Sequence, residues 1–240
     1  MLNFIKMFYK KIKLKQISEE TEDSILITYT HVFHKEYPRF PIIKLSRFEE
    51  NDSELETLLE MRESTRTFSN KPINLKDISK ILRSCRIVNP NRDPEKRTYP
   101  SGGARFPVEL YLISYNIKNL NPGAYHYNIK KEALELLLKK DLKNRRREFI
   151  SPYLENPATT IVFTSVLARS EVKYGLRAYP YSLIEAGHMG QNIHLACAEL
   201  GLGSCSVSGF VDDSVKEVLD LTEDEIPIYT ISLGIKKTIV

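Results

Sequence analysis

Apolar residues recur at helical spacing in two segments of the first third of the chain. Ser53 and Glu56 have the spacing of an N-terminal capping box, and the apolar residues within 55–61 follow at helical period. A second helix is expected to begin at Asn74, because the apolar residues of 78–85 fall on one face. Each of these helices should bury one side against a core.

Segments rich in apolar and β-forming residues predict a set of strands. The run at 158–166 is nearly continuous in β-branched residues, which is typical of a strand buried on both faces. Further strands are expected at 108–114, 124–128, 133–137, 204–208 and 226–233, the second and third pairing as a hairpin and the last two flanking a helix capped by Asp212. Strands separated by helices in a mixed order indicate an α+β or α/β sandwich.

Residues 183–200 form the longest candidate helix, which is apolar on most of its circumference. Gly187 and Gly190 permit close packing, so we expect the helix to be buried, either inside the domain or in a dimer interface. His188 and His194 are six residues apart, a spacing that does not place two metal ligands on one helix face. We interpret both as buried, hydrogen-bonded histidines rather than catalytic ones, and His188 as a candidate for the dimer seam.

The first 45 residues differ from the rest of the chain. They begin with several lysines and continue with Pro38, Pro41 and aromatic residues, and proline biases its neighbours toward extended conformations. We therefore expect an extended N-terminal arm over residues 1–45, wrapping a surface, and one folded domain over residues 46–240. The start of the chain lacks the basic-then-apolar order of a signal peptide.

Composition narrows the class of protein. Of the 240 residues, 42% are hydrophobic and 28% are charged, the balance of a soluble globular chain. The cysteines Cys85, Cys197 and Cys205 form no C-x-x-C pair, and no apolar run approaches the ~18 residues of a membrane span. We expect a cytoplasmic protein with free cysteines, no metal site and no association with a membrane.

The net charge is +4, and the excess lies mainly in the basic run at 139–147. Its sequence, Lys-Lys-Asp-Leu-Lys-Asn-Arg-Arg-Arg, could contact nucleic acid or an acidic partner through its charge. No aromatic platform or nucleic-acid-binding signature accompanies it. We therefore interpret the run as a solvated helix face and expect no nucleic-acid partner.

Two segments have residue types that suit a phosphate and a flat ligand. Arg62, Ser64 and Arg66 occupy alternate positions, which lie on one side of an extended chain and suit a phosphate. Residues 100–107, Pro-Ser-Gly-Gly-Ala-Arg-Phe-Pro, have paired glycines that let the backbone approach a flat ligand closely. Neither the spacing of a Rossmann loop nor that of a P-loop is present, and each segment alone is also compatible with an ordinary surface turn.

Two later segments complete a set of four. Residues 201–210, Gly-Leu-Gly-Ser-Cys-Ser-Val-Ser-Gly-Phe, follow the apolar helix. Lys173 and Tyr174 are adjacent on a predicted loop after the buried strand. An ammonium group beside a phenol favours its ionised form, which makes the tyrosine a better proton acceptor.

Taken in order, these segments make the chain resemble the nitroreductase superfamily of FMN-dependent enzymes, and within it the SagB-type dehydrogenases. The resemblance covers residues 58–234, and its most specific part is Glu-Ala-Gly-His-Met-Gly-Gln-Asn at 185–192, ahead of Gly-Leu-Gly. It implies the α+β nitroreductase fold, a central, mostly antiparallel sheet surrounded by helices. It also implies an intertwined homodimer with two FMN sites at the interface.

The resemblance also implies residue roles in binding the cofactor. The FMN phosphate and ribityl chain would be held by Arg62, Ser64 and Arg66, with Lys236 as a looser match that completes the phosphate site. The flavin ring would pack on a loop of Pro100, Ser101 and Gly102, usually from the other subunit, with Ser208 and Gly209 facing its reactive edge. Ala104 stands where many nitroreductases carry Asn, so a polar contact is missing there or comes from Arg105.

The implied catalytic pair is Lys173 and Tyr174, which match the Lys-Tyr pair linked to azoline oxidation in the SagB-type branch. The leading function is therefore FMN-dependent oxidation of a thiazoline or oxazoline in a modified peptide to the azole. The alternatives are an NAD(P)H-dependent nitro or quinone reductase acting on a small molecule, and a non-catalytic flavin-fold subunit of a modifying complex. A cyclodehydratase is a candidate partner, and either residue of the pair is a candidate base.

Overall fold

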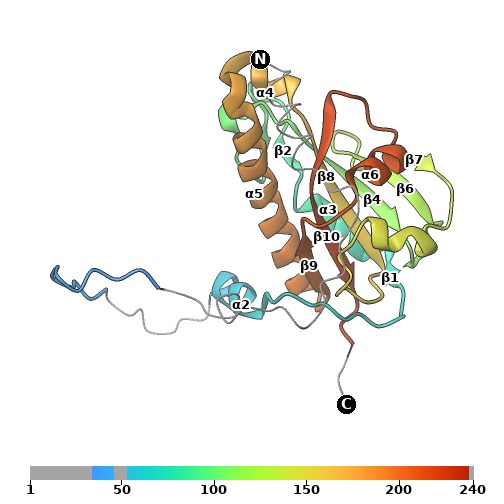
Figure 1. The fold of residues 1–240 in the computed structure, drawn as a ribbon, viewed down its shortest axis with the longest axis horizontal. Coiled ribbons are helices and arrows are strands. Elements are labelled where there is room, and N and C mark those ends of the chain that lie inside the picture. Colours follow the sequence, from blue (N-terminus) through green and yellow to red (C-terminus); the bar gives the residue numbers. More distant parts are fainter. Residues whose placement is uncertain (1–33, 46–52, 238–240) are drawn as a thin grey trace.

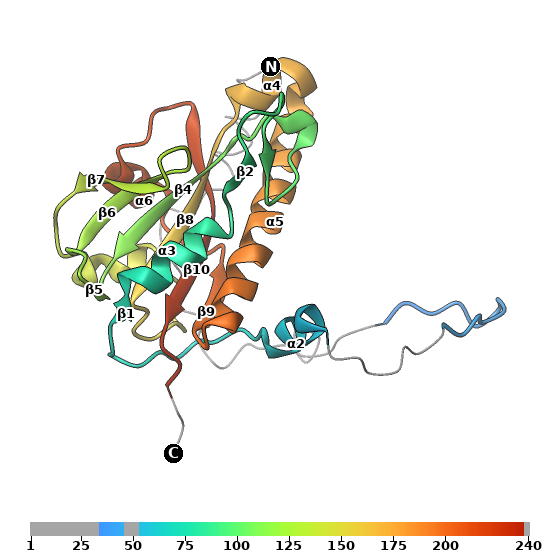
Figure 2. The ribbon, with the colours of Figure 1, turned by 180° about the vertical axis from the view of Figure 1, so that it is seen from behind.

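A six-stranded antiparallel sheet forms the centre of the protein (Figures 1 and 2). The computed structural model describes residues 34–45 and 53–237. The strand order is β7-β6-β4-β8-β10-β9, made of β4 (Val108–Ser114), β6 (Gly123–Asn128), β7 (Ala133–Leu138), β8 (Thr159–Val166), β9 (Gly203–Val207) and β10 (Glu225–Gly234). Each neighbouring pair in this sheet is antiparallel, which confirms the predicted sheet and its hairpin.

Helices cover both faces of the sheet. The helices α3 (Leu75–Arg83) and α5 (Ala178–Glu199) pack on one face, and α6 (Asp212–Leu219) packs on the other beside the 3-10 helix Lys143–Glu148. Alternate residues of β4 join the two cores, Leu110 and Leu112 on the first face and Tyr111 and Ile113 on the second. The strand β8 is buried on both faces, as its β-branched run predicts. The α+β class is therefore confirmed.

Smaller elements flank this core. The helix α2 (Glu54–Met61) begins with the predicted capping box, since the Glu56 N–H donates to Ser53 Oγ (3.1 Å) and the Ser53 N–H donates to the Glu56 carboxylate (3.3 Å). Asn74 precedes α3, as predicted. Two further pairs of short strands are β1 (Ile73–Asn74) with β5 (Ile117–Lys118), and β2 (Ile87–Asn89) with β3 (Lys96–Arg97).

The long helix begins earlier than the apolar pattern predicts. It starts at Ala178 rather than at residue 183 and ends at Glu199. Pro180 lies in the first turn of α5, where an N–H would have no helical partner in any case, so the proline is compatible with the helix there. At α6 the N-cap is Val211 rather than the predicted Asp212, which lies buried in the first turn.

The Lys173–Tyr174 pair lies on a helix and not on the predicted loop. Its helix, α4 (Ala168–Tyr174), follows β8 almost directly and ends where Gly175 adopts a φ of 54°. A positive φ carries little cost in glycine, which explains why the helix stops immediately after the pair. Figure 1 shows α4 at the N-terminal end of α5.

The basic run at 139–147 is more engaged than a solvated helix face. Part of it forms the 3-10 helix Lys143–Glu148, in which Arg145 donates to Glu148 (2.8 Å) and Glu217 (2.9 Å). The Arg146 guanidinium lies 5.1 Å from the centre of the Tyr115 ring. The run is therefore bound partly by its own chain. Cys85, Cys197 and Cys205 are free and buried, as expected.

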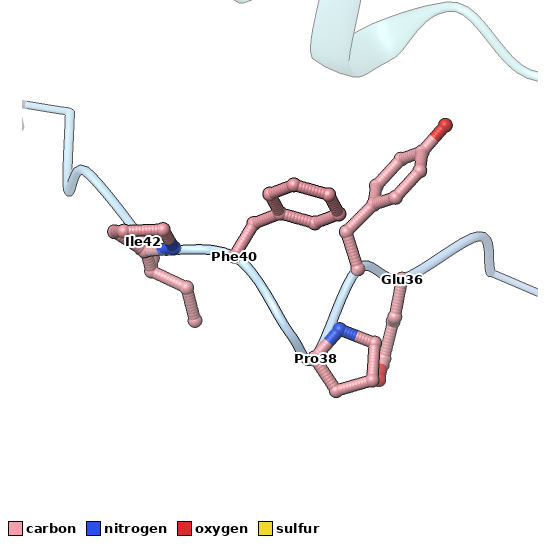
Figure 3. Close-up of a pocket in the computed structure, with 6 residues that line it drawn as sticks. Glu36, Pro38, Phe40 and Ile42 are labelled. Atoms are coloured by element: carbon pink, nitrogen blue, oxygen red, sulfur yellow. The ribbon is translucent and has the colours of Figure 1, made fainter.

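Residues 34–45 are exposed and lie apart from the sheet (Figures 1 and 2). The chain bends there, with the rings of Tyr37 and Phe40 edge to face and their centroids 6.1 Å apart. Figure 3 shows this bend and a shallow hollow lined by Glu36, Pro38, Phe40 and Ile42 among others. Residues 1–33 and 46–52 lie outside the described ranges, so the arm and its boundary at residue 45 stay a prediction. Within the described ranges, no helix is both long enough and apolar enough to span a membrane.

Candidate functional site

The predicted phosphate-binding residues lie on one extended segment at the edge of the sheet. Ser64 forms a parallel bridge with Ser204 of β9, and the Thr65 N–H donates to the Ser204 carbonyl (2.9 Å). Lys236, just beyond β10, reaches the same segment, because its Nζ lies 2.8 Å from Glu63 Oε1. We call Arg62, Ser64, Arg66 and Lys236 the basic cluster.

Two glycines allow this segment to lie so close to the sheet. A Cβ at Gly203 would stand 2.7 Å from the Thr65 side chain, and a Cβ at Gly234 would stand 2.6 Å from the Phe68 ring. Real Cβ atoms do not approach other atoms this closely, so side chains at these positions would push the segment away. The glycines of β9 and β10 therefore position the basic cluster.

A buried histidine supports the basic cluster from behind. His194 of α5 is hydrogen-bonded through Nδ1 to Ser204 Oγ and through Nε2 to Ser206 Oγ, both at 2.7 Å. Burial, and to a smaller extent the charge of Arg62, lowers the pKa of His194 to about 4, so the ring is neutral at pH 7. The interpretation of His194 as a satisfied buried histidine is confirmed. His188 is exposed on α5, so for that residue the expectation of burial is wrong in the single chain.

The donor set of the basic cluster suits a phosphate. Three cations and a hydroxyl group surround one strand edge, and arginine forms paired charge-assisted bonds to phosphate oxygens. Ser208 and Gly209 lie past the other end of β9, about 13 Å from Ser204 along an extended strand. A Cβ at Gly209 would meet nothing within 4 Å, so the space beside it is open. The edge of β9 therefore has phosphate-compatible donors at one end and open space at the other.

A second polar cluster forms where α4 meets the loop after β3. A Cβ at Gly103 would overlap the Tyr174 hydroxyl and stand 2.9 Å from Lys173 Nζ, so both polar groups lie against this glycine. The Tyr174 ring packs edge to face on Tyr181, with centroids 5.1 Å apart, and Tyr181 also contacts Gly102. We call Lys173, Tyr174 and the loop 100–104 the Lys–Tyr cluster.

The structure thus places the predicted catalytic pair against the predicted flavin-contacting loop, although the two are far apart in the sequence. Lys173 and Tyr174 were expected to act on the substrate, and Pro100, Ser101 and Gly102 were expected to contact the flavin. The sequence pattern assigns no role to Tyr181, and it treats Gly103 only as one of two paired glycines; in the structure Gly103 has a φ of +60°, which favours glycine. Arg105 is exposed, and its Nε donates to the Arg169 carbonyl at 2.6 Å, which leaves its other N–H groups for a ligand.

The basic cluster and the Lys–Tyr cluster lie at opposite ends of α5. Tyr181, which contacts Gly102, and His194, which contacts Ser204, are separated by about 20 Å along the helix axis at 1.5 Å per residue. Figures 1 and 2 show the same relationship, with α4 at one end of α5 and β9 at the other. The structure does not bring all the predicted flavin-contacting residues together within one chain.

Between the two clusters, α5 exposes an apolar face. Leu183 is 40% exposed and Ile184 is 56% exposed, and Gly187 follows one turn later. The nearby helix α2 contacts α5 and exposes Leu55, Leu59 and Met61. Exposed apolar groups therefore occur near both ends of α5, and contiguous groups of this kind mark interaction surfaces. Within the described residues, no group of three or more potential ligands is placed to hold a metal ion.

The protein thus has an α+β fold, a basic cluster at one strand edge and a separate Lys–Tyr cluster. The sequence pattern of the nitroreductase family matches residues 59–235. The chain therefore belongs to the nitroreductase family, and the predicted family and fold are confirmed.

Individual relatives come from both peptide processing and flavin reduction. The microcin B17-processing protein McbC of Escherichia coli is 29% identical over 158 residues, covering 63% of this chain and 58% of McbC. The FMN reductase (NADPH) of Bacillus subtilis is 23% identical over 193 residues, covering 75% of this chain and 64% of the reductase. Among solved structures, the E. coli microcin synthetase McbBCD complex with truncated pro-MccB17 matches with a TM-score of 0.80 and 23% identity, covering 99% of this chain and 93% of that chain.

Proposed function

We propose that the protein is an FMN-dependent dehydrogenase that oxidises thiazoline or oxazoline rings in a modified peptide to azoles. The observation that carries the proposal is the contact of Lys173 and Tyr174 with Gly103, in the loop expected to pack on the flavin. This contact supports the proposal that a proton-accepting pair lies beside the flavin. The relationship to McbC, which is named as a peptide-processing protein, supports a peptide substrate.

The basic cluster is the proposed site of the FMN phosphate. Arg62, Ser64, Arg66 and Lys236 would bind the phosphate and ribityl chain, and the open space beside Gly209 would receive the edge of the ring. When bound, FMN supplies a two-electron acceptor. The protein has to hold the flavin and the substrate ring next to each other, in the orientation that hydride transfer needs, and to keep water away from both.

A homodimer would complete the cofactor site. The loop 100–102 lies about 20 Å along α5 from the basic cluster, too far for one FMN to contact both in a single chain. If two copies pack through the exposed faces of α5 in antiparallel fashion, the N-terminal end of one α5 meets the C-terminal end of the other. Two composite sites then form, each with a basic cluster from one protomer and a Lys–Tyr cluster from its partner.

Within that site, Tyr174 is the proposed base. Oxidation of an azoline removes one carbon-bound proton and one hydride equivalent, so atoms and electrons balance if a base takes the proton and the flavin takes the hydride. A positioned base contributes roughly 10²–10⁴-fold to the rate of such a step. The Lys173 Nζ lies 5.4 Å from the centre of the Tyr174 ring, so both groups of the pair lie at the same site. The reverse assignment, with Lys173 as the base, is distinguished by the variants described in the Discussion.

The proposed reaction also defines a partner. An azoline ring must be closed by loss of water before it can be oxidised, so a cyclodehydratase has to supply the substrate. The likeness in fold to the McbBCD complex supports the proposal that this chain works in an assembly with such an enzyme.

A single-turnover experiment tests the proposal. The protein with bound FMN is mixed anaerobically with a peptide that contains one thiazoline, and the flavin absorbance and peptide mass are followed. The expected result is bleaching of the flavin together with loss of two hydrogens from the peptide. If the flavin keeps its colour and the peptide its mass, azoline oxidation is excluded for that substrate.

The relationship to an FMN reductase supports a second candidate, an NAD(P)H-dependent nitro or quinone reductase. In that case NAD(P)H bleaches the flavin, a nitro compound restores its colour, and Lys173→Ala has no effect on either rate. A protein that reacts with neither the peptide nor NAD(P)H would instead be a non-catalytic subunit.

A further inference from the structure

The loop after Ser101 has an unusual backbone. Gly103, Ala104 and Phe106 have φ values of 60°, 51° and 47°, in the left-handed region. A positive φ is uncommon for alanine and unfavourable for a bulky residue such as phenylalanine. Such a conformation persists only where surrounding contacts fix it, so the loop 101–107 needs a clamp.

Several contacts fix the loop at Phe106. The Phe106 N–H donates to Ser101 Oγ (2.9 Å), and an Arg169 N–H donates to the Phe106 carbonyl (3.1 Å). The Arg97 guanidinium stacks 3.9 Å from the centre of the Phe106 ring, and Tyr99 meets the same ring edge to face at 5.9 Å. The two ends of the loop, at Ser101 and Val108, lie next to one further side chain, which belongs to α5.

That side chain is Glu185, an acidic residue inside the core. It is 2% exposed, and its Oε1 accepts a hydrogen bond from the Val108 N–H (3.4 Å), at the end of the loop. The Ser101 hydroxyl, at the start of the loop, also lies near the carboxyl group and favours its ionised form. The second oxygen, Oε2, is buried without a hydrogen-bond partner.

Burial raises the pKa of Glu185 to about 7. The groups that oppose this shift are the Ser101 hydroxyl, the Val108 N–H and the cations Arg97 and Arg169. Tyr99 also interacts with Glu185, and burial raises the pKa of this tyrosine. A carboxyl group at this position therefore changes protonation near neutral pH.

We propose that Glu185 is a positioning residue beneath the loop 101–107, bonded to the end of the loop at Val108, and that the loop loosens when the Glu185 carboxyl loses its proton, because the closed loop keeps this carboxyl away from water. The proposal rests on the proposed function only in identifying this loop as the one that packs on the flavin. Because Gly103 lies against Lys173 and Tyr174, loosening of the loop would also disturb the alignment of the Lys–Tyr cluster.

The direction of the pH effect follows from the two conformations of the loop. If the open loop exposes Glu185 to water, its pKa returns toward the ordinary value of 4.5, while in the closed loop it is about 7. The proton then favours the closed loop, fully so below pH 4.5, and this contribution is lost as the pH rises to about 7. Above that pH the stability of the closed loop should no longer change through this group.

Hydrogen exchange of the Phe106 and Val108 amides tests the proposal on the protein as isolated. Exchange is measured from pH 5 to pH 8 and divided by the intrinsic chemical rate at each pH. The wild-type protection factor should fall by up to about tenfold per pH unit between pH 5 and pH 7 and then level off. Glu185→Gln, which keeps the shape of the acid and cannot ionise, should hold the low-pH protection at every pH.

Two further variants complete the test. Glu185→Ala should lose protection of the loop at all pH values, and Glu171→Gln on α4, where the carboxyl is not part of the clamp, should keep the wild-type pH dependence. A wild-type profile that is flat, or one that Glu185→Gln reproduces, would overturn the proposal even if Glu185→Ala fails to fold. The readout needs neither flavin nor substrate, so its outcome is separate from that of the azoline experiment.

Discussion

The hydroxyl group of Tyr174 lies against Gly103, on the face of the loop where any Cβ would occupy the same space. The contact joins the end of α4 to the loop that follows β3. Its first consequence concerns stability, because an alanine at position 103 has to displace Tyr174 and also adopt a φ of +60°.

Gly103→Ala should therefore destabilise the protein by about 1–3 kcal/mol, the usual cost of a forced left-handed residue. The neighbouring Gly102→Ala is the matched control, since its Cβ would lie 3.4 Å from Tyr181 in ordinary contact. That variant should stay within about 0.5 kcal/mol of wild type. Chemical denaturation of both variants measures the difference, and equal stability of the two would show that Gly103 is not confined by Tyr174.

The basic cluster predicts the strength of flavin binding. Arg62→Ala combined with Arg66→Ala should abolish FMN retention, because each hydrogen bond from a charged group contributes roughly 1.5–3 kcal/mol. Arg92→Ala, which removes an exposed arginine elsewhere, should bind FMN as wild type does. Titration followed by flavin fluorescence measures the dissociation constants. Wild-type affinity in the double variant would contradict the assignment of the phosphate site.

His194 predicts a loss of stability in acid. Its pKa is about 4 in the folded protein and 6.5 when unfolded, so the unfolded chain binds more protons between these values and stability falls as the pH drops through them. The full effect is about 3 kcal/mol. His194→Gln should remove this part of the pH dependence, whereas His188→Gln, on the exposed side of the same helix, should keep it. Urea denaturation at pH 4 and pH 7 gives both slopes, and identical slopes in the two variants would refute the role of His194.

If the exposed face of α5 forms the dimer interface, a charged side chain introduced on that face should separate the two protomers. A substitution at Gly190 of the same helix would not test this interface, because Gly190 is buried within the chain and a Cβ there would stand 3.0 Å from the Tyr229 side chain. Ile184→Lys should instead separate the protomers and release FMN, since Ile184 is 56% exposed in the single chain. Leu137→Lys, at an exposed position on β7, is the control and should leave a flavin-loaded dimer. Sedimentation velocity measures the outcome, and a wild-type monomer that retains FMN would rule out the shared site.

Local patterns were sufficient to predict most of the fold. The β-branched run of β8 and the capping box at Ser53 depend on neighbouring residues, and both are found where the sequence places them. The start of α5 was predicted too late, because the apolar pattern begins at residue 183 whereas the helix begins at Ala178, with Pro180 in its first turn, where proline is tolerated.

The candidate site was less accessible from sequence because its contacts are long-range. Lys236 meets Glu63 across 173 positions, and Gly103 meets Tyr174 through the packing of α4 on a distant loop. Glu185 lies in the family-like string at 185–192, but only its burial and its partners Ser101 and Val108 suggest a role. No spacing rule connects these residues before the chain is folded.

The most direct test of the account is the rate of azoline oxidation in Tyr174→Phe, measured in a single turnover with FMN bound. The variant should retain FMN and the oligomeric state of wild type, because the phenyl ring preserves the contact with Tyr181. Its oxidation rate should fall by roughly 10²–10⁴-fold, the contribution of a positioned base. Lys173→Ala should show a smaller loss if the ammonium only stabilises the phenolate, and a larger loss than Tyr174→Phe would make Lys173 the base. Oxidation at the wild-type rate in both variants would contradict the central claim that the Lys–Tyr pair performs the proton transfer.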